Sequence, residues 1–404
     1  MLTFAVIMLI NTIKELANKY AQEFIDIRHY IHAHPELSYQ EFETSKYIQQ
    51  KLAEYNIPYE VKATTGVVGL IKGKNPGSRI VALRADIDAL PIKEENDVPY
   101  KSTREGIMHA CGHDVHTTCL LGAAKILSET KDSWEGTVKL IFQPGEEKNP
   151  GGASLLIKEG VLKDPEPECI FGMHVNPQLE VGYLSFQKGK VMASADELYI
   201  TVKGKGGHAA APHFTIDTIL VASHLIIALQ HIISRHNNPL SPSVLTISSI
   251  NGGNTTNIIP TEVKLMGTFR AMDEAWRFKA HELIRKVSNE LVSSMGAEAD
   301  VHIDVGYPCV FNDEGLYEVA RKIGEDFMPQ GKVGETEIRM GAEDFGFYGQ
   351  HVPACFFRLG TANKSKGITA GVHTPIFNID ESAIETGIGI MASLGALATY
   401  KKDL

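Results

Sequence analysis

Cysteine is scarce in this sequence, and its spacing shows no pairing. The chain of 404 residues has five cysteines, scattered and without a C-x-x-C pair. An odd number with this spacing argues against a disulfide framework and favours the reducing cytoplasm. The sequence also lacks a run of basic residues, and its formal net charge of -10 opposes binding to nucleic acid or anionic lipid. We therefore expect neither nucleic acid nor a membrane as a partner.

The apolar N-terminal segment lacks the features of a signal peptide or of a membrane span. The segment Met1 to Ile10 is nearly all apolar, but no basic residue precedes it, no small-residue cleavage site follows it, and it is about half a membrane span. We expect this segment to pack against the protein or to be a wrongly assigned leader, with Met8 as an alternative start. Hydrophobic residues make up 43% of the chain and charged residues 22%, which is typical of a folded globular protein.

The length exceeds that of a single hydrophobic core, so about two domains are expected. In the first 190 residues, apolar runs of strand length alternate with apolar residues at helical spacing, which predicts a sheet covered by helices. The predicted strands are 66–71, 79–83, 137–142 and 169–173, and the predicted helices are 41–55, 115–129 and 152–159. A similar pattern returns after about residue 308 and ends in a predicted helix over 381–400.

A different order lies between these parts. It reads strand 196–203, helix 215–235, strands 243–250 and 262–270, helix 273–295 and strand 298–305, which is the order of a ferredoxin-like sandwich. Asp273 is a good N-cap, and Asn251 to Asn254 form a turn cluster. We predict a discontinuous α/β catalytic domain over 1–192 and 308–404, with a ferredoxin-like α+β domain inserted at 193–307.

The densest chemical cluster is the segment His109 to His116, which holds a thiol, a carboxylate and three imidazoles. Cys111 and His113 would diverge on a helix, but on a glycine-containing loop that enters a helix they can converge on one ion. Asp114 would then cap that helix. Each of these residues alone has an ordinary structural explanation, as a small buried thiol or a surface histidine. Their crowding favours a metal site.

Two adjacent carboxylates, Glu146 and Glu147, follow a predicted strand. In extended chain they would point in opposite directions, so that one could bind a metal while the other faces the attacking water. A solvated loop is the usual explanation of such a pair, but the end of a strand in a metal-bearing sheet favours the functional interpretation. His174 follows the next strand and His373 lies in a G-V-H-T-P segment, where each alone could be structural.

Eight segments together resemble the aminoacylase/carboxypeptidase family of dimetal peptidases. Within it they are similar to the amidohydrolase branch of hippurate hydrolases, auxin-conjugate hydrolases and N-acyl-L-amino-acid amidohydrolases. The segments are 31–37, 84–91, 108–116, 142–147, 172–175, 204–211, 340–345 and 373–375. The resemblance runs in order over nearly the whole chain. It implies a metal-dependent hydrolase of N-acyl-L-amino acids or small peptides, with the inserted domain as a lid that forms a homodimer.

The resemblance also implies a role for each site residue. Cys111 would bridge two divalent ions, with His113, Glu147, His174 and His373 as the other metal ligands, Glu146 as general base, His208 polarising the scissile carbonyl, Asn257 and Arg270 gripping the substrate carboxylate, and Asp88 orienting a ligand. The wider family has a carboxylate bridge, and a histidine ligand where Asp86 stands here. A thiolate bridge suits zinc, while the other ligands would also accept manganese, cobalt or nickel.

Two other functions compete with this one. The run Gly204 to Ala209 matches a G-x-G-x-x-A dinucleotide fingerprint, but Pro212 interrupts the helix that should follow, and no Asp or Glu occurs between Thr218 and Thr261. We therefore reject a nucleotide-dependent oxidoreductase. The second alternative is a non-catalytic metal-binding protein with the same fold, which predicts a closed site with four ligands. Glu146 argues against it, because such a site has no use for a second carboxylate.

Overall fold

The computed structural model describes residues 4–398 and divides into two compact units. Unit 1 comprises Met1–Val191, Phe311–Glu337 and Asp344–Leu404, and unit 2 comprises Met192–Val310 and Ile338–Glu343. The segment Ile338–Glu343 was expected in the catalytic domain. It belongs to unit 2 because the N–H of Ala193 donates to the carbonyls of Arg339 and Gly341, both at 3.1 Å.

The sheet of unit 1 has a parallel centre. Its strands run in the order β1-β2-β4-β3-β5-β16-β6-β15. Their bounds are β1 Tyr59–Lys62, β2 Gly66–Lys72, β3 Ile80–Asp86, β4 Thr137–Gln143, β5 Cys169–Glu180, β6 Leu184–Phe186, β15 Val333–Glu335 and β16 Ala354–Ala362. Strand β3 is parallel to β4 and β5, and β5 is parallel to β16. Every residue of β4 and β16 is buried, as expected of strands covered on both faces. The carboxyl ends of these strands therefore share one edge.

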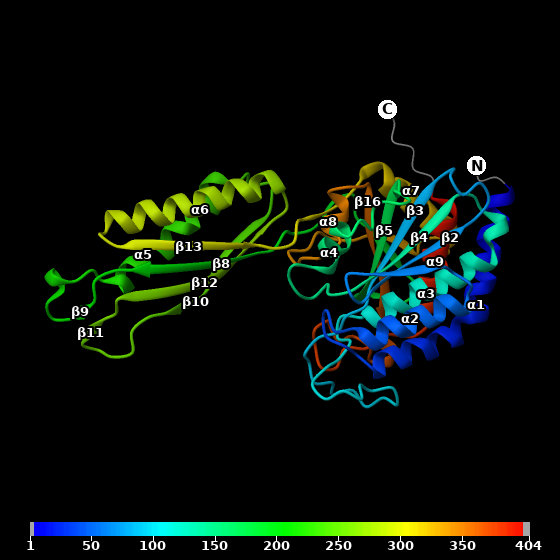
Figure 1. Ribbon diagram of the computed structural model, residues 1–404, viewed down its shortest axis with the longest axis horizontal. Coiled ribbons are helices and arrows are strands. Elements are labelled where there is room, and N and C mark those ends of the chain that lie inside the picture. The colour runs from blue at the N-terminus through cyan, green and yellow to red at the C-terminus, as the bar shows by residue number, and fades with distance from the viewer. Residues whose placement is uncertain (1–3, 399–404) are drawn as a thin grey trace. The chain divides into compact units, whose positions relative to one another are not determined.

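Helices cover both faces of this sheet. They are α1 Phe4–Ala33, α2 Phe42–Glu54, α3 His113–Glu129, α4 Gly152–Lys158, α7 Glu314–Phe327, α8 Gly346–Gly349 and α9 Ala383–Leu397. Helices α1, α3 and α9 pack against one another on one side of the sheet, and α4 and α8 lie on the other (Figure 1). The predicted helix over 381–400 corresponds to α9, and positions 399 and 400 lie outside the described residues.

Helix α1 is the main element of unit 1 that the sequence did not predict. Only its apolar start was expected to pack, and within the described residues Leu9 and Ile10 do so, whereas Phe4, Ile7 and Met8 are exposed. Further along the helix, Ile13 and Phe24 are completely buried in the core of unit 1. Alanines and charged residues separate these buried residues along α1, so the sequence does not show the helical spacing of its apolar face clearly.

Unit 2 is the predicted ferredoxin-like sandwich. Its elements are β8 Asp196–Lys203, α5 Thr218–His231, β10 Ser243–Asn251, β12 Glu262–Ala271, α6 Glu274–Ser294 and β13 Glu298–Val305. The strands run in the order β10-β12-β8-β13, all antiparallel. Residues of β8 alternate between buried and more exposed, so one face packs on α5 and α6. Asp273 caps α6 as predicted, accepting from the N–H of Trp276 at 2.8 Å.

Two short ribbons complete the described strands. Strand β7 (Gly189–Met192) pairs with β14 (Val310–Asn312), and β9 (Gly207–His208) pairs with β11 (Ile258–Ile259). Strands β9 and β11 continue from the Lys203 end of β8 and the Glu262 end of β12, at the far tip of this sheet (Figure 1).

Helix α5 continues in a π-helical turn, Ile232–His236, and the combined stretch Thr218–His236 is the one described helix that is long and apolar enough to cross a membrane. Its buried residues, among them Val221, Leu225 and Leu229, belong to the core of unit 2, as in a core helix of a two-layer domain. The opposite face is apolar and exposed. Ile219, Leu220 and Ile227 have 42%, 51% and 72% of their surface accessible, so this face has no cover from residues 4–398.

Candidate metal centre

The five predicted metal ligands converge near the carboxyl edge of the parallel strands of unit 1. Cys111 lies in the loop that enters α3, His113 is the first residue of α3, Glu147 follows β4, His174 is in β5, and His373 lies in the loop before α9. The Sγ atom of Cys111 is 3.4 Å from Nε2 of His174 and 3.3 Å from Nε2 of His373. Oε1 of Glu147 is 3.1 Å from Nε2 of His373. All five cysteines of the chain are free thiols.

Cys111 belongs to two groups of potential ligands. One group is Cys111, His113 and His174, and the other is Cys111, Glu147 and His373. In each group the candidate ligand atoms lie within 4.8 Å of one another. A thiolate shared between two sets of nitrogen and oxygen donors is suited to two transition ions.

The hydrogen bonds of the imidazoles aim their lone pairs into this cluster. Nδ1 of His113 lies 3.0 Å from the carbonyl oxygen of Asp88 and 3.2 Å from its Oδ1, and both atoms can only accept, so Nδ1 carries the proton. Nδ1 of His174 likewise donates to the carbonyl of Val175 at 2.8 Å. Nε2 of His113 is buried without a hydrogen-bond partner among residues 4–398. A metal ion is the partner that such a nitrogen fits.

The electrostatics of the cluster also fit cations. Burial raises the pKa of the Cys111 thiol, and the nearby Glu147 carboxylate raises this pKa further. Hydrogen bonds to Cys111 and Glu147 raise the pKa of His373 to about 10. Burial lowers the pKa of His174 well below its usual value. Because ligands bind metal in their deprotonated forms, Cys111 and His373 would each have to lose a proton to hold a metal ion here.

The backbone of His373 is in a conformation that few residues adopt. Its φ is 61°, in the left-handed region, and its N–H donates to the carbonyl of Ala110 at 2.7 Å. A non-glycine residue in this region costs about 1–3 kcal/mol and persists where the surroundings enforce it. The bond to Ala110 holds the His373 loop beside Cys111.

In a further close group, Asp86, His113 and His116, protein contacts satisfy Asp86 and His116. Nε2 of His116 accepts from the N–H of Val175 at 2.9 Å, so its Nδ1 carries the proton and donates to Oδ1 of Asp86 at 2.6 Å. Arg84 donates to the other oxygen of Asp86 at 2.8 Å. His116 therefore has no lone pair left for a metal. Asp86 and His116 support the ligand cluster through their hydrogen bonds to Arg84 and Val175.

Glu146 and Glu147 do not lie on extended chain, contrary to the prediction. Both are in a turn that begins at Gly145, whose φ is 57°. Oε2 of Glu146 and Oε1 of Glu147 lie 4.0 and 3.9 Å from the same atom, Nε2 of His113. The two carboxylates therefore reach the cluster together, and the division of roles between them depends on the turn.

The expectation that Asp114 caps α3 is also wrong. The N-cap is Gly112, with a φ of 89° and no side chain to cap with. Asp114 lies in the first turn of the helix, where its buried carboxylate accepts from Nε of Arg28 at 2.7 Å and interacts with Nδ1 of His32 at 2.8 Å. Arg28 and His32 are on α1, so this buried ion pair fixes the start of α3 to α1.

The other predicted residues, His208, Asn257 and Arg270, are in unit 2. Nδ1 of the exposed His208 accepts from the N–H of Ala210 at 3.0 Å, so a neutral His208 carries its proton on Nε2 and can donate it. The N–H of Ala209 donates to the carbonyl of Asn257 at 3.0 Å, which holds Asn257 beside His208. Oδ1 of Asn257 accepts from Thr255 at 2.9 Å, which orients its amide nitrogen as the donor.

Arg270 lies at the other end of β12. Phe269, its neighbour, pairs with Asp196 at the start of β8, whereas Glu262 pairs with Lys203 at the end of β8. Eight residues of extended strand separate Arg270 from Glu262, which corresponds to roughly 26 Å. Asn257 lies beyond Glu262, in the ribbon at the tip. Within one chain, Asn257 and Arg270 therefore cannot grip the same carboxylate, contrary to the expectation.

The sequence reasoning missed the segment Ser38–Glu41, which contacts the Glu146 turn and Asp88. These residues follow the His34-Pro35-Glu36-Leu37 segment that contributed to the resemblance, but no role could be assigned to them. Their partners are at positions 88 and 145–151, so no local spacing indicates the contact. The one available signal was a charged residue, Glu41, within the predicted helix over 41–55.

Comparison with known proteins identifies the family. The model of Peptidase family M20/M25/M40 matches residues 82–396. Thermostable carboxypeptidase 2 of Saccharolobus solfataricus is 40% identical over 93% of this chain and 94% of its own length. N-acetyl-L-cysteine deacetylase of Bacillus subtilis is 40% identical over 90% of this chain and 85% of its own length.

A solved structure agrees with this assignment. The Bacillus subtilis YxeP protein, described as a dinuclear metal binding peptidase from the M20 family, is 34% identical, with a TM-score of 0.82 over 94% of this chain and 98% of its own. The resemblance found in the sequence is confirmed over nearly the whole length: this chain belongs to peptidase family M20/M25/M40.

Proposed function

We propose that this protein is a metal-dependent amidohydrolase that cleaves the amide bond of N-acyl-L-amino acids or small peptides. The observation that carries the proposal is the pair of ligand groups sharing Cys111, with Glu146 beside them in the same turn as Glu147. Two relatives are named as a carboxypeptidase and an N-acetyl-L-cysteine deacetylase, and both names describe cleavage of an amide bond to an amino acid. The proposed substrate class is common to both.

The chain's residues would divide the reaction as follows. When bound, the two metal ions would lower the pKa of the attacking water and polarise the amide carbonyl. Glu146 takes the proton from this water and later returns it to the leaving amine. Nε2–H of His208 donates to the carbonyl oxygen as negative charge develops there. Arg270 pairs with the substrate carboxylate, to which a guanidinium fork is suited.

Zinc is the metal we propose, because a shared thiolate suits it, with manganese, cobalt or nickel as alternatives. We also propose a cytoplasmic location, since five free thiols, four of them buried, suit a reducing compartment. The alternative of a non-catalytic metal protein is disfavoured by Glu146, whose carboxylate lies 4.0 Å from Nε2 of His113 although Glu147 already supplies a carboxylate donor.

A homodimer through the inserted domain is the partner we propose. The apolar face of α5, with Ile219, Leu220 and Ile227, is exposed among the described residues and is a candidate interface. Strand β10, at one edge of the sheet of unit 2, has free backbone groups along its outer side. The separation of Asn257 from Arg270 adds a chemical reason, because His208 and Asn257 of one copy can complete the substrate site of another.

Metal binding should stabilise the protein measurably. At a free metal concentration of about 100 times Kd, the free energy of unfolding should rise by about 2.7 kcal/mol for each site. Thermal or denaturant unfolding with and without a chelator measures this, and elemental analysis should find about two ions per chain. Cys111→Ala should lose at least one ion, whereas Cys309→Ala, a control in unit 2, should keep both. Full amidase activity in metal-free protein would refute the proposal.

The two neighbouring glutamates should behave differently. Glu146→Gln should keep the metals and lower kcat by roughly 10²–10⁴-fold, because only the proton acceptor is lost. Glu147→Gln should weaken metal binding, because a ligand is lost. Metal analysis and steady-state kinetics of both variants measure this. Metal loss in the first variant alone would show that the two roles are reversed.

Arg270 should act only on substrates with a carboxylate. Arg270→Ala should lower kcat/KM for N-acyl amino acids by about 2–4 kcal/mol, the range for truncating one partner of a charged hydrogen-bonded pair. Amidated substrates should be poor for the parent protein and lose little more, as a double-mutant cycle with the substrate as one partner would show. Equal losses on both substrates would mean that Arg270 supports unit 2 and does not contact the substrate.

Two inactive variants should restore activity when they are mixed. Glu146→Gln and His208→Ala remove different residues, and a heterodimer in which His208 acts on the other copy has one intact site. Random exchange of subunits makes half of the dimers mixed, so activity should recover to about a quarter of the parent's. Unfolding and refolding the mixture together, followed by an amidase assay, tests this. Absence of recovery in a mixture shown to contain heterodimers would place His208 in the site of its own chain.

A further inference from the structure

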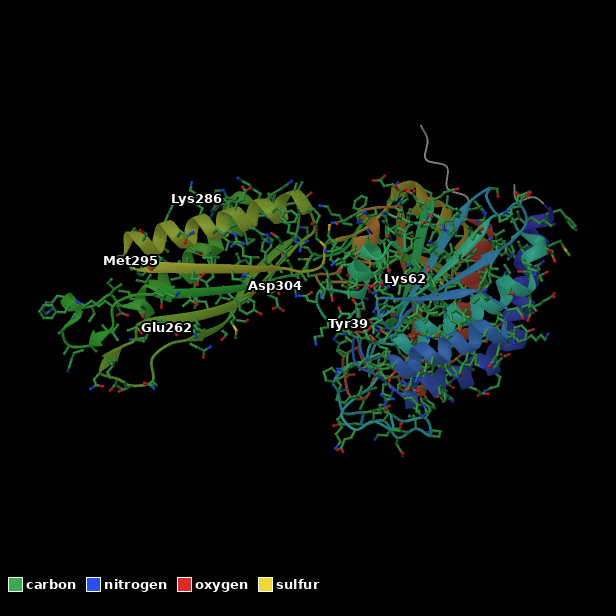
Figure 2. All side chains as sticks on the ribbon, in the orientation of Figure 1. Tyr39, Lys62, Glu262, Lys286, Met295 and Asp304 are labelled. Atoms are coloured by element: carbon green, nitrogen blue, oxygen red, sulfur yellow. The ribbon has the colours of Figure 1, made fainter. Side chains whose placement is uncertain are left out.

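The turn that carries Glu146 and Glu147 is held by a segment that lies 104 residues earlier in the sequence, counted from Glu41 to Gly145. This segment, Ser38–Glu41, connects α1 to α2, and we call it the clasp. Tyr39, labelled in Figure 2, is its central residue. The turn, Gly145–Gly151, has no regular secondary structure of its own, so its position depends on contacts from outside.

Glu41 anchors the start of the turn. One oxygen of its carboxylate, Oε1, accepts from the N–H of Gly145 at 2.8 Å and from the N–H of Tyr39 at 2.9 Å. The other oxygen accepts from the hydroxyl of Thr65 at 2.7 Å. Glu41 is completely buried, so this carboxylate was removed from water in exchange for three hydrogen bonds. Such an arrangement is expected where the acceptor has a specific task.

Tyr39 anchors the far end of the same turn. Its hydroxyl donates to the carbonyl of Lys148 at 2.5 Å and accepts from the N–H of Gly151 at 3.0 Å. Its ring lies directly on Gly145, where a Cβ atom would come within 2.2 Å of Cε1 of the ring. Both Tyr39 and Gly145 have left-handed backbones, with φ of 67° and 57°. The Glu41 carboxylate therefore links these two left-handed residues, because it accepts from the N–H group of each.

Ser38 reaches the turn through Asp88. The hydroxyl of Ser38 donates to Oδ2 of Asp88 at 2.6 Å, and the same oxygen accepts from the N–H of Glu147 at 3.0 Å. The clasp thus contacts the turn directly before and after the two carboxylates, and it reaches the N–H of Glu147 through Asp88.

We propose that the clasp is a positioning device for the catalytic turn, in which the Glu41 carboxylate and the Tyr39 hydroxyl hold Glu146 in the geometry needed for proton transfer. This inference rests on the proposed role of Glu146 as general base. Glu41 does not touch the substrate or the metal ligands and acts through the backbone of Gly145. Because proton transfer is sensitive to displacements of about 1 Å, loss of the clasp should lower turnover more than binding.

The proposal requires an acceptor at position 41 and not a charge. Burial, with a further contribution from Asp88, raises the pKa of Glu41 to about 7, so its neutral form is accessible near neutral pH. In Glu41→Gln, Oε1 can still accept from both N–H groups, and the amide can donate to the hydroxyl oxygen of Thr65. Glutamine should therefore rescue the function that alanine removes.

Glu36 provides a matched control five residues away. It is also a buried carboxylate that accepts from a backbone N–H, that of Thr44 at 2.8 Å, and from the Thr44 hydroxyl at 3.0 Å. Its second oxygen accepts from Arg104 at 3.2 Å. None of these groups belongs to the turn, so a general loss of stability in this part of the protein should appear in Glu36→Gln and Glu36→Ala as well.

The test compares these variants in the full-length protein with zinc in excess. Glu41→Ala should lower kcat about 10- to 100-fold with KM little changed and both metals bound, and Tyr39→Phe should lower it about 3- to 10-fold. Glu41→Gln, Glu36→Gln and Glu36→Ala should stay within about threefold of the parent. Tyr39→Phe removes a single hydroxyl and keeps the test valid if Glu41→Ala fails to fold.

Hydrogen exchange of the metal-free protein gives a measurement independent of activity. Amides of 145–151 should exchange about 5- to 30-fold faster in Glu41→Ala, as expected for a lost buried hydrogen bond, and at the parent rate in both Glu36 variants. If the parent protein has no amidase activity, the proposed function fails, while this exchange measurement still decides whether the clasp holds the turn.

Three results would overturn the inference. The first is parent-like kcat and exchange in Glu41→Ala. The second is a kcat loss in Glu36→Ala equal to that in Glu41→Ala, which would indicate general destabilisation. The third is a Glu41→Gln variant as impaired as Glu41→Ala, which would show that charge, and not hydrogen bonding, is what position 41 supplies.

Discussion

The buried carboxylate of Asp88 is the constraint on which the geometry of the metal centre depends. Oδ1 faces Nδ1 of His113 at 3.2 Å, and Oδ2 accepts from the N–H of Glu147 and the hydroxyl of Ser38. Burial, the largest single effect, opposes its charge, but the hydrogen bonds from His113, Ser38 and the N–H of Glu147 and the charge of His113 together lower the pKa of Asp88. One ionised group therefore fixes the tautomer of His113, the backbone of Glu147 and the position of the clasp. These are the contacts that a residue needs if it is to orient a metal ligand, the role that the sequence predicted for Asp88.

A second buried network holds the strands that bring these parts together. Asp344 accepts from Arg84 at 2.7 Å, from Gln143 at 2.8 Å and from the N–H of Ala153 at 3.0 Å. Arg84 is on β3, Gln143 ends β4, and Ala153 begins α4, so the contacts lie on both sides of the catalytic turn. The charges are buried but paired, and removing one partner would leave the others uncompensated, which is costly. The turn is thus held at its base by Asp344 and at its sides by the clasp.

The sequence predicted the parts of the fold that repeat a pattern and the ligands that are crowded along the chain. Continuous apolar runs marked β2 to β5, and the order of unit 2 followed from its alternating periods. Cys111 and His113 were found because they are neighbours. The sequence could not show the turn at Gly145, because two adjacent glutamates look alike in extended and in turned chain. Nor could it show the contact of Asp114 with Arg28, which joins residues 86 positions apart.

Left-handed backbone recurs around the turn at Gly145 and near Cys111, and hydrogen bonds enforce it at Tyr39, Gly145 and His373. Tyr39 and Gly145 are held by the carboxylate they share, and His373 by its bond to Ala110. Position 145 must be glycine for two reasons: a side chain would be strained at a φ of 57°, and it would displace the ring of Tyr39. A left-handed backbone persists where its surroundings enforce it, so the shape of the turn and of the His373 loop depends on hydrogen bonds from other segments of unit 1. The arrangement of this edge of the sheet is therefore a property of the assembled unit, and no single segment would hold it alone.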